Sequence, residues 1–134
     1  MSLWQIRAYY LEGGSCPILT WYAAQDEEVQ AGFDATLTTL RATMDWTDTD
    51  IWQFKALTRN DAGLGEIRFN LKGPPLRRFR PVGIWPPIVE REFILLLGCE
   101  KLRNGIYIPN DAFAVALEYK RRCDAGIGEV HDYF

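Results

Sequence analysis

The sequence predicts a single domain of the α+β class. The chain has 134 residues, near the commonest size of one domain, and no repeat, low-complexity tract or linker divides it. Apolar residues follow a helical period in much of the first half and a strand period in most of the second half. Helices and strands that are separated along the chain in this way are typical of α+β domains, so we assign residues 1–134 to one such domain.

The first half predicts one strand followed by helices. Residues Trp4 to Tyr10 roughly alternate and are rich in strand-forming residues, so we expect the first strand there. Between Asp26 and Met44, an apolar residue recurs at every third or fourth position, which predicts an amphipathic helix. The segment from Thr47 to Leu57 is compatible with a second, short helix. That helix would end in the turn from Arg59 to Gly63.

The second half predicts an antiparallel meander of three strands. Gly65 to Lys72 alternates cleanly between apolar and polar residues, and Leu76 to Trp85 reads as the next strand. Within that strand, Pro81 removes one ladder donor and predicts an edge position or a bulge. Glu92 to Cys99 is almost continuously apolar, as in a central strand buried on both faces. Turns rich in proline separate the three strands, at Gly73-Pro74-Pro75 and Trp85-Pro86-Pro87.

A helix is predicted to close the domain. Asn110 is a suitable N-cap, and the apolar positions that follow it have helical spacing. We expect this helix to run to about Asp124 and to stop at Gly126. Three cations lie in its last turn, where they suit the helix dipole: Lys120, Arg121 and Arg122.

Composition argues against several classes of protein. The three cysteines are odd in number and widely spaced, and His131 is the only histidine, so neither a disulfide framework nor a metal site is expected. The longest apolar run, Phe93 to Cys99, is far shorter than the roughly 20 residues that span a bilayer, so we expect no membrane segment. Met1 to Tyr10 does not have the pattern of a signal peptide. Together these features predict a cytoplasmic protein without a cofactor.

Positive charge is concentrated in one part of an acidic chain. The net charge of the whole chain is −3. Residues 67–89 nevertheless contain five basic side chains and no acidic one: Arg68, Lys72, Arg77, Arg78 and Arg80. Such a block can attract a polyanion such as a nucleic acid. The alternative is a pair of solvated strands whose arginines meet carboxylates from elsewhere in the fold.

Four segments in the second half carry a resemblance to a known family of proteins. Gly63 to Phe69 (GLGEIRF) is similar to the Gly-Leu-(Trp/Tyr)-Glu-(Ile/Leu)-Arg strand of RelE-like toxins. Phe79 to Gly83 (FRPVG) is similar to their aromatic-Arg-Pro-Leu-Gly strand. Glu92 to Lys101 is similar to their last strand and its basic exit, and Ile108 to Arg122 to their closing Pro-then-Ala-rich helix. The chain therefore resembles the RelE/ParE superfamily of toxins, in its phage-derived, HigB-like branch. The resemblance covers about residues 63 to 122 and implies a RelE-like fold.

The resemblance implies a ribosome-dependent mRNA endoribonuclease, the toxin of a type II toxin–antitoxin system. In this reaction a 2′-hydroxyl attacks the adjacent phosphate without the help of a metal. The reaction needs a base for the hydroxyl, cations for the phosphorane and an acid for the leaving 5′-oxygen. The partners that the resemblance implies are the ribosome, mRNA and a cognate antitoxin, expected to be a small helix-turn-helix protein.

Four residues are assigned to catalysis on this resemblance. Arg68 and Arg80 match the family's strand arginines and are expected to clamp the phosphate, since a guanidinium binds phosphate with two hydrogen bonds and stays charged. Lys101 would bind phosphate or transfer a proton, and His131 in the tail would act as the base. Five further residues are candidates for RNA binding: Lys72, Arg77, Arg78, Tyr107 and Tyr133. A structural alternative for Arg68 is an ion pair across the sheet with Glu66 or Glu92.

Two other functions remain open from the sequence. The same fold on the ParE side of the superfamily would poison DNA gyrase and would involve no RNA chemistry. A phage or prophage protein of this fold would bind a partner without any catalysis. The acidity of the whole chain, with a pI near 5.2, departs from the basic members of the superfamily.

Overall fold

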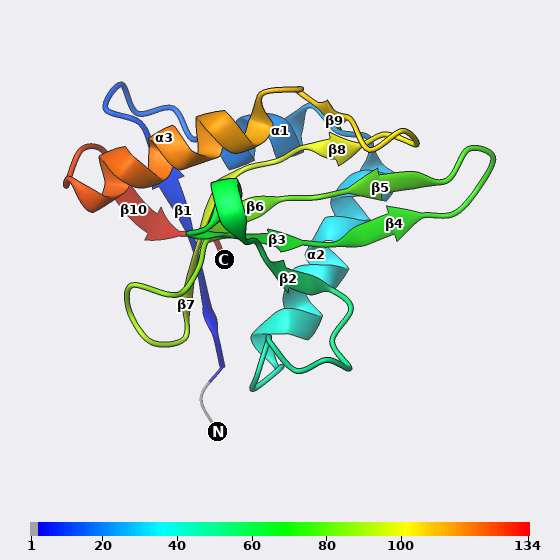
Figure 1. The fold of residues 1–134 in the computed structure, drawn as a ribbon, viewed down its shortest axis with the longest axis horizontal. Coiled ribbons are helices and arrows are strands. Elements are labelled where there is room, and N and C mark those ends of the chain that lie inside the picture. Colours follow the sequence, from blue (N-terminus) through cyan, green and yellow to red (C-terminus); the bar gives the residue numbers. More distant parts are fainter. Residues whose placement is uncertain (1–2) are drawn as a thin grey trace.

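The computed structural model describes residues 3–134 and confirms a mixed α+β fold (Figure 1). Its helices are α1 (Pro17–Ala23), α2 (Glu27–Arg41), α3 (Ala112–Asp124) and the 3-10 turn η1 (Arg59–Asp61). Its strands are β1 (Gln5–Tyr10), β2 (Phe54–Ala56), β3 (Leu64–Ile67), β4 (Phe69–Leu71), β5 (Arg77–Phe79), β6 (Val82–Ile84), β7 (Glu92–Leu97), β8 (Glu100–Lys101), β9 (Tyr107–Ile108) and β10 (Glu129–Asp132).

The strands form two sheets, and the second sheet continues the strands of the first. The larger sheet has the order β10-β1-β7-β6-β3-β2, and the smaller has the order β4-β5-β8-β9. Along the chain, β4 follows β3, β6 follows β5 and β8 follows β7, each after a short break. The neighbours β3, β6 and β7 pair antiparallel, which confirms the predicted three-stranded meander. Strand β1 lies parallel to β7.

Helices cover both faces of the larger sheet. Helix α1 packs on β7 and β1, and α2 packs on β4 and β1. Helix α3 packs on β7 and β6 from the opposite side, and it lies in front of the sheet in Figure 1. Two apolar clusters result, one with Phe33 and Phe93 beneath α1 and α2, and one with Val82 and Ala116 beneath α3. Strand β7 contributes to both clusters, as its apolar run predicted.

Two meander strands are interrupted, one at Pro81 as the sequence suggested and one at Arg68, within the segment predicted as a single strand from Gly65 to Lys72. Pro81 lies between β5 and β6, and the register shifts between Val82 and Gly83. The bulge is therefore confirmed, and the edge position is wrong, because β5 and β6 each have a partner strand on both sides. Arg68 separates β3 from β4 in the same way, and its amide donates to the carbonyl of Gln53 at 2.7 Å.

The helix predicted over Thr47 to Leu57 is wrong. This segment consists of turns followed by β2, which pairs with β3. Asp45 accepts a hydrogen bond from the amide of Thr47 at 2.9 Å, and Asp48 accepts one from the amide of Asp50 at 2.9 Å. Aspartates that bond the backbone two residues ahead stabilise turns in competition with a helix.

Helix ends also differ from the prediction. Asp26 caps α2, because its side chain accepts a hydrogen bond from the amide of Val29 at 3.0 Å. The helix ends at Arg41, so Met44 lies outside it. Helix α3 has Asp111 rather than Asn110 at its N-cap position, without a side-chain hydrogen bond. Its stop at a glycine is confirmed, since Gly126 has a φ of 76°. Helix α1 and strand β10 were not predicted. Within residues 3–134, no helix is both long and apolar enough to cross a membrane.

Candidate functional site

Five cations from neighbouring strands lie on the α3 side of the sheet. Directly opposite residues on antiparallel strands project to the same face. Glu66 is opposite Val82, which packs beneath α3, and Lys55 is opposite Glu66. In the smaller sheet, Asn70, Arg78 and Lys101 are opposite one another in turn. We call this surface the cationic face and define it by Lys55, Arg68, Arg78, Arg80 and Lys101.

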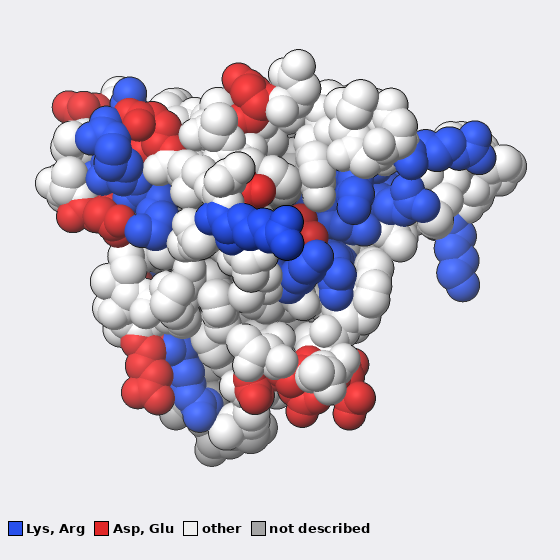
Figure 2. Space-filling view, viewed as in Figure 1, with Lys and Arg blue, Asp and Glu red and all other residues white. Residues whose placement is uncertain are grey.

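The cationic face is visible in Figure 2, where Lys and Arg side chains gather over β3, β4, β5 and β8. Most acidic side chains on this side of the molecule lie around that area rather than within it. Helix α3 covers the neighbouring part of the sheet, over β6 and β7 (Figure 1), and the cationic side chains are visible at the surface beside it (Figure 2).

Arg80 is the buried centre of the cationic face. Arg80 is only 5% exposed, and burial lowers the pKa of its guanidinium from the ordinary value. Its Nη1 donates to the carbonyl of Phe79 at 2.7 Å, to Asn70 Oδ1 at 3.2 Å and to the carbonyl of Phe69 at 3.4 Å. Within residues 3–134, all the hydrogen bonds of the Arg80 side chain come from this one nitrogen. The rest of the guanidinium fork can therefore bind an anion.

Arg68 shares an aromatic neighbour with Arg80. The Cζ atoms of Arg68 and Arg80 lie 5.2 and 5.7 Å from the ring centre of Trp52. The Nε of Arg68 also donates to the carbonyl of Trp52 at 2.8 Å. Trp52 is 46% exposed, although it is a large aromatic residue. An exposed indole beside two guanidinium groups offers a surface on which a nucleobase can stack.

A buried carboxylate lies among these cations. Glu66 is 5% exposed, and its Oε2 is buried without a hydrogen-bond partner. Burial raises the pKa of this carboxyl above its ordinary value, while Arg80, Arg68, Lys55 and Lys101 oppose that rise. The net effect is a rise, so desolvation outweighs the attraction of the four cations.

Lys101 and Tyr107 complete the cationic face on the side of β8 and β9. They are opposite each other in the sheet, with the Lys101 Nζ 5.9 Å from the centre of the tyrosine ring. Burial first, and then the nearby Glu66, raises the pKa of Tyr107 to about 12. The Cys99 thiol donates to the carbonyl of Arg80 at 3.0 Å, and burial raises its pKa to about 12. Both groups are thus protonated near neutral pH and can donate a hydrogen bond but cannot accept a proton.

A groove of about 750 Å³ lies between the two hairpins of the smaller sheet, next to Arg78 and Lys101 of the cationic face. It is lined by Pro75, Leu76, Arg77, Arg78, Glu100, Lys101, Leu102, Arg103 and Asn104. Four of these side chains are cations and one is an acid. The acid is occupied, because Glu100 accepts two hydrogen bonds from Arg77, at 3.1 and 2.8 Å. The groove is therefore positively charged and has apolar walls, a combination that suits a nucleotide.

The structure brings together part of the predicted site. The contacts above bring five of the predicted residues close to one another: Arg68, Arg78, Arg80, Lys101 and Tyr107. The ion pair of Arg68 with Glu92 does not form, because Glu92 pairs with Arg7 at 3.3 Å. Lys72 is exposed in the turn after β4.

Three predicted residues lie elsewhere. His131 is in β10 at the edge of the larger sheet, where its ring lies 4.9 Å from that of Tyr10, and two strands separate β10 from β6. Tyr133 packs into the cluster beneath α1 and α2, with its ring 5.9 Å from that of Phe33. Arg77 is opposite Leu71 and lies over the ring of Phe79, which belongs to that same cluster, so it projects to the other face from Arg78.

Three members of the site were missed as functional residues. Glu66 was expected only as an ion-pair partner of Arg68, although its alternation with Arg68 already places both on one face. Lys55 and Trp52 were placed in the helix that does not form. No signal in the sequence indicates that their loop folds back against β3.

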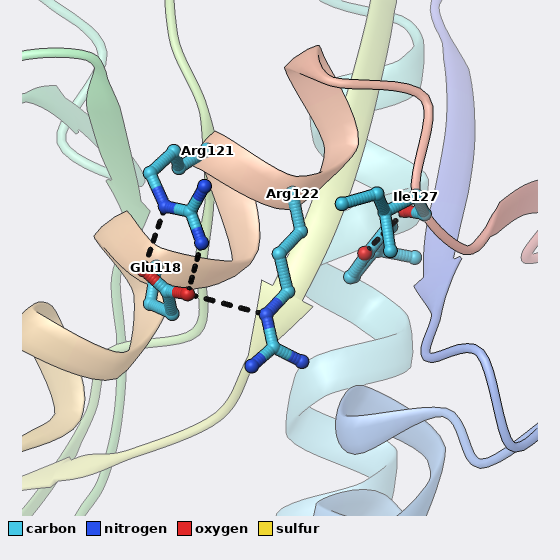
Figure 3. Close-up of polar contacts among 5 residues, drawn as sticks. Glu118, Arg121, Arg122 and Ile127 are labelled. Carbon is cyan, nitrogen blue, oxygen red and sulfur yellow. Dashed lines mark hydrogen bonds and ion pairs between the residues drawn. The ribbon is translucent and has the colours of Figure 1, made fainter.

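The basic end of α3 is a separate group that its own carboxylates neutralise. Glu118 accepts hydrogen bonds from Arg121 at 2.9 and 2.6 Å and from Arg122 at 3.2 Å (Figure 3). These bonds lower the pKa of Glu118 to about 2. Lys120 pairs in the same way with Asp124 at 2.6 Å. The three cations thus fulfil a helix-terminal role and do not extend the cationic face.

The arrangement can bind phosphate oxygens and stack bases, since it combines guanidinium and ammonium groups with an exposed indole. Within residues 3–134, no group of three or more His, Cys, Asp or Glu is placed to hold a metal ion. No protein-family model, curated protein or solved structure matches this chain.

Proposed function

We propose that this chain is an mRNA-cleaving toxin of the RelE/ParE type. The observation that carries the proposal is the convergence of Arg68 after β3, Arg80 after β5 and Lys101 of β8 around Glu66 on one face of the sheet. Two further features support it. The order of a strand, helices, an antiparallel meander and a last helix is the order that the resemblance implies. The groove beside Arg78 and Lys101 has the charge and size for a single strand of RNA.

The proposed reaction assigns each cation to one part of the scissile phosphodiester. Arg68 and Arg80 bind the non-bridging oxygens, which carry more charge in the phosphorane than in the diester. The 2′-oxygen forms a bond to phosphorus as the bond to the 5′-oxygen breaks, leaving a cyclic phosphate and a 5′-hydroxyl. Lys101 gives a proton to the departing 5′-oxygen. The proton of the 2′-hydroxyl passes to water, because His131 lies at the far edge of the sheet.

The partners follow from the same proposal. The substrate is mRNA on the ribosome, and the protein acts in the cytoplasm. A cognate antitoxin, which we propose is a helix-turn-helix protein, would block activity by placing carboxylates over Arg68 and Lys101. Purification of the chain together with the product of its neighbouring gene would test this partnership.

A second candidate function is binding of RNA or another partner without cleavage. The position of His131 favours it, since the residue expected to act as the base is not on the cationic face. The same fold acting as a ParE-like gyrase poison is the third candidate from the sequence, and no contact of the cationic face favours it over RNA.

Inducible expression in a bacterial host separates these functions. The wild type is compared with Arg68→Ala and with Arg121→Ala, a matched control on α3 that is outside the cationic face. We expect growth arrest and new 5′ ends on a translated message with the wild type and the control, and neither effect with Arg68→Ala. Arrest with DNA breaks and intact mRNA would replace the proposal with gyrase poisoning. Expression without arrest or cleavage would leave binding alone.

A further inference from the structure

Glu66 is a buried carboxylate among the cations that would bind a phosphate, so a bound phosphate would lie close to its negative charge. Its Oε2 is buried and lacks a hydrogen-bond partner, and the residue as a whole is 5% exposed. Arg80, which is equally buried, makes its hydrogen bonds to carbonyl oxygens and to Asn70 rather than to this carboxylate. The carboxylate thus balances the buried guanidinium by its charge while one of its own oxygens stays without a donor.

Groups from every neighbouring strand act on Glu66. Four are cations: Lys55 of β2, Arg68 after β3, Arg80 after β5 and Lys101 of β8. Two are weak acids that Glu66 in turn affects, Cys99 and Tyr107, and both have pKa values of about 12 and carry no charge near neutral pH. Glu66 is therefore the group on this surface whose charge is most readily lost, because burial has already raised its pKa.

We propose that an RNA phosphate binds among Arg68, Arg80 and Lys101 together with one proton, which Glu66 takes up. This inference rests on the proposed function and identifies Glu66 as the residue that sets the affinity of the site for the RNA backbone. In the empty site the carboxylate is the counter-charge of Arg80. In the filled site the phosphate replaces that counter-charge. The carboxyl of Glu66, whose Oε2 has no donor in the empty site, is then protonated and can itself donate a hydrogen bond through its O–H.

The physical reason is the cost of two anions in one buried place. A phosphate brought beside an ionised and poorly hydrated carboxylate adds like-charge repulsion to desolvation, and both favour the protonated form. The pKa of Glu66 is then higher in the complex than in the free protein. Affinity is therefore greatest at low pH and falls as pH rises between these two pKa values, by about tenfold per pH unit for one proton.

A binding experiment with an uncleavable ligand tests this inference apart from cleavage. The ligand is a 2′-O-methyl RNA oligonucleotide without terminal phosphates, so that its own charge is constant between about pH 5 and pH 8. Isothermal titration in two buffers of different ionisation enthalpy measures the protons taken up on binding. The proteins are the full-length wild type, Glu66→Gln and Glu118→Gln. Glu118 is a matched control, because its carboxylate also contacts arginines but has a pKa of about 2 (Figure 3).

We expect the wild type and Glu118→Gln to take up at most one proton, with the greatest uptake between the two pKa values of Glu66, and to lose affinity as the pH rises through that interval. Glu66→Gln should take up none and should bind about tenfold or more tightly than the wild type at pH 8, with little dependence on pH. Uptake by the wild type is measured without any substitution, so the test stands even if Glu66→Gln does not fold. Binding without proton uptake, or uptake that Glu66→Gln retains, would overturn the inference and leave RNA cleavage standing. Failure of the wild type to bind the oligonucleotide at any pH would overturn both.

Discussion

Replacing Arg80 tests whether the buried pair of charges is energetically coupled. Arg80→Met keeps an unbranched apolar side chain but removes the guanidinium that balances Glu66. The substitution leaves the carbonyl of Phe79 without its donor at 2.7 Å and Asn70 Oδ1 without its donor at 3.2 Å. It also removes the largest of the attractions that oppose the rise in the pKa of Glu66.

These losses set the expected magnitude. A hydrogen bond from a charged group contributes about 1.5–3 kcal/mol, and removal of one partner of a buried charge pair costs about 3–5 kcal/mol. We therefore expect Arg80→Met to lower the free energy of unfolding by about 3–5 kcal/mol at pH 7. Glu66→Gln alone should have a smaller effect, because Gln conserves the shape and removes a desolvated charge. The double variant should be less destabilised than the two single effects predict together, by about 1–3 kcal/mol.

Urea unfolding of the four proteins measures this coupling. At about pH 4, below the ordinary carboxyl pKa of 4.5, Glu66 carries a proton in both the folded and the unfolded states, so the coupling should disappear. Because the pKa of Glu66 is raised in the folded protein, the wild type should lose stability as the pH rises from 4.5 through the folded-state pKa, and Glu66→Gln should not. Additivity within about 0.5 kcal/mol at pH 7 would refute the reasoning, since it would mean that the two charges do not interact.

Three further outcomes are expected. Gly98→Ala should destabilise the fold by about 1–3 kcal/mol in a chemical denaturation experiment, because a Cβ there would overlap the indole of Trp21; unchanged stability would mean that α1 is not packed on β7 as described. A thiol reagent at about pH 8 should label Cys123, which is half-buried, and should reach Cys99 only after unfolding, because burial raises the pKa of Cys99 to about 12; rapid labelling of Cys99 would contradict its burial. Binding of single-stranded RNA should weaken with salt, and Arg78→Ala should reduce the slope of log affinity against log salt by about 0.7; an unchanged slope would place Arg78 outside the interface.

The sequence predicted the strands and the long helices better than the short elements. Alternation from Gly65 to Lys72 and the apolar run from Glu92 to Cys99 are local signals, and both segments are strands of the meander. The prediction of a helix from Thr47 to Leu57 was wrong, because aspartate-stabilised turns and pairing with β3 determine the conformation of this segment. Strand β10 has no strong pattern of its own, and its conformation depends on the free edge of β1.

Some features of the candidate site also follow from the sequence, and others do not. The pairing of Glu66 with Arg68 on one face follows from the period of a strand and needs no tertiary information. The same period separates Arg77 from Arg78, so the basic block of the sequence is divided between two faces. His131 was assigned to catalysis on the resemblance, and the structure places it at the far edge of the sheet.

The sequence by itself therefore determined the class of the fold, the order of its main elements and the concentration of positive charge in residues 67–89. Each of these depends on periodicity or composition within a short stretch of chain. The tertiary structure decided which cations meet and which charges are buried. Lys55 and Lys101 act on Glu66 only because β2 and β8 lie beside the meander strands, and Trp52 lies beside Arg80 because its loop leads into β2. The burial of Arg80 and Glu66, and the shifts in their pKa values, arise from atoms of several strands that exclude water together, and no single segment of the sequence contains that information.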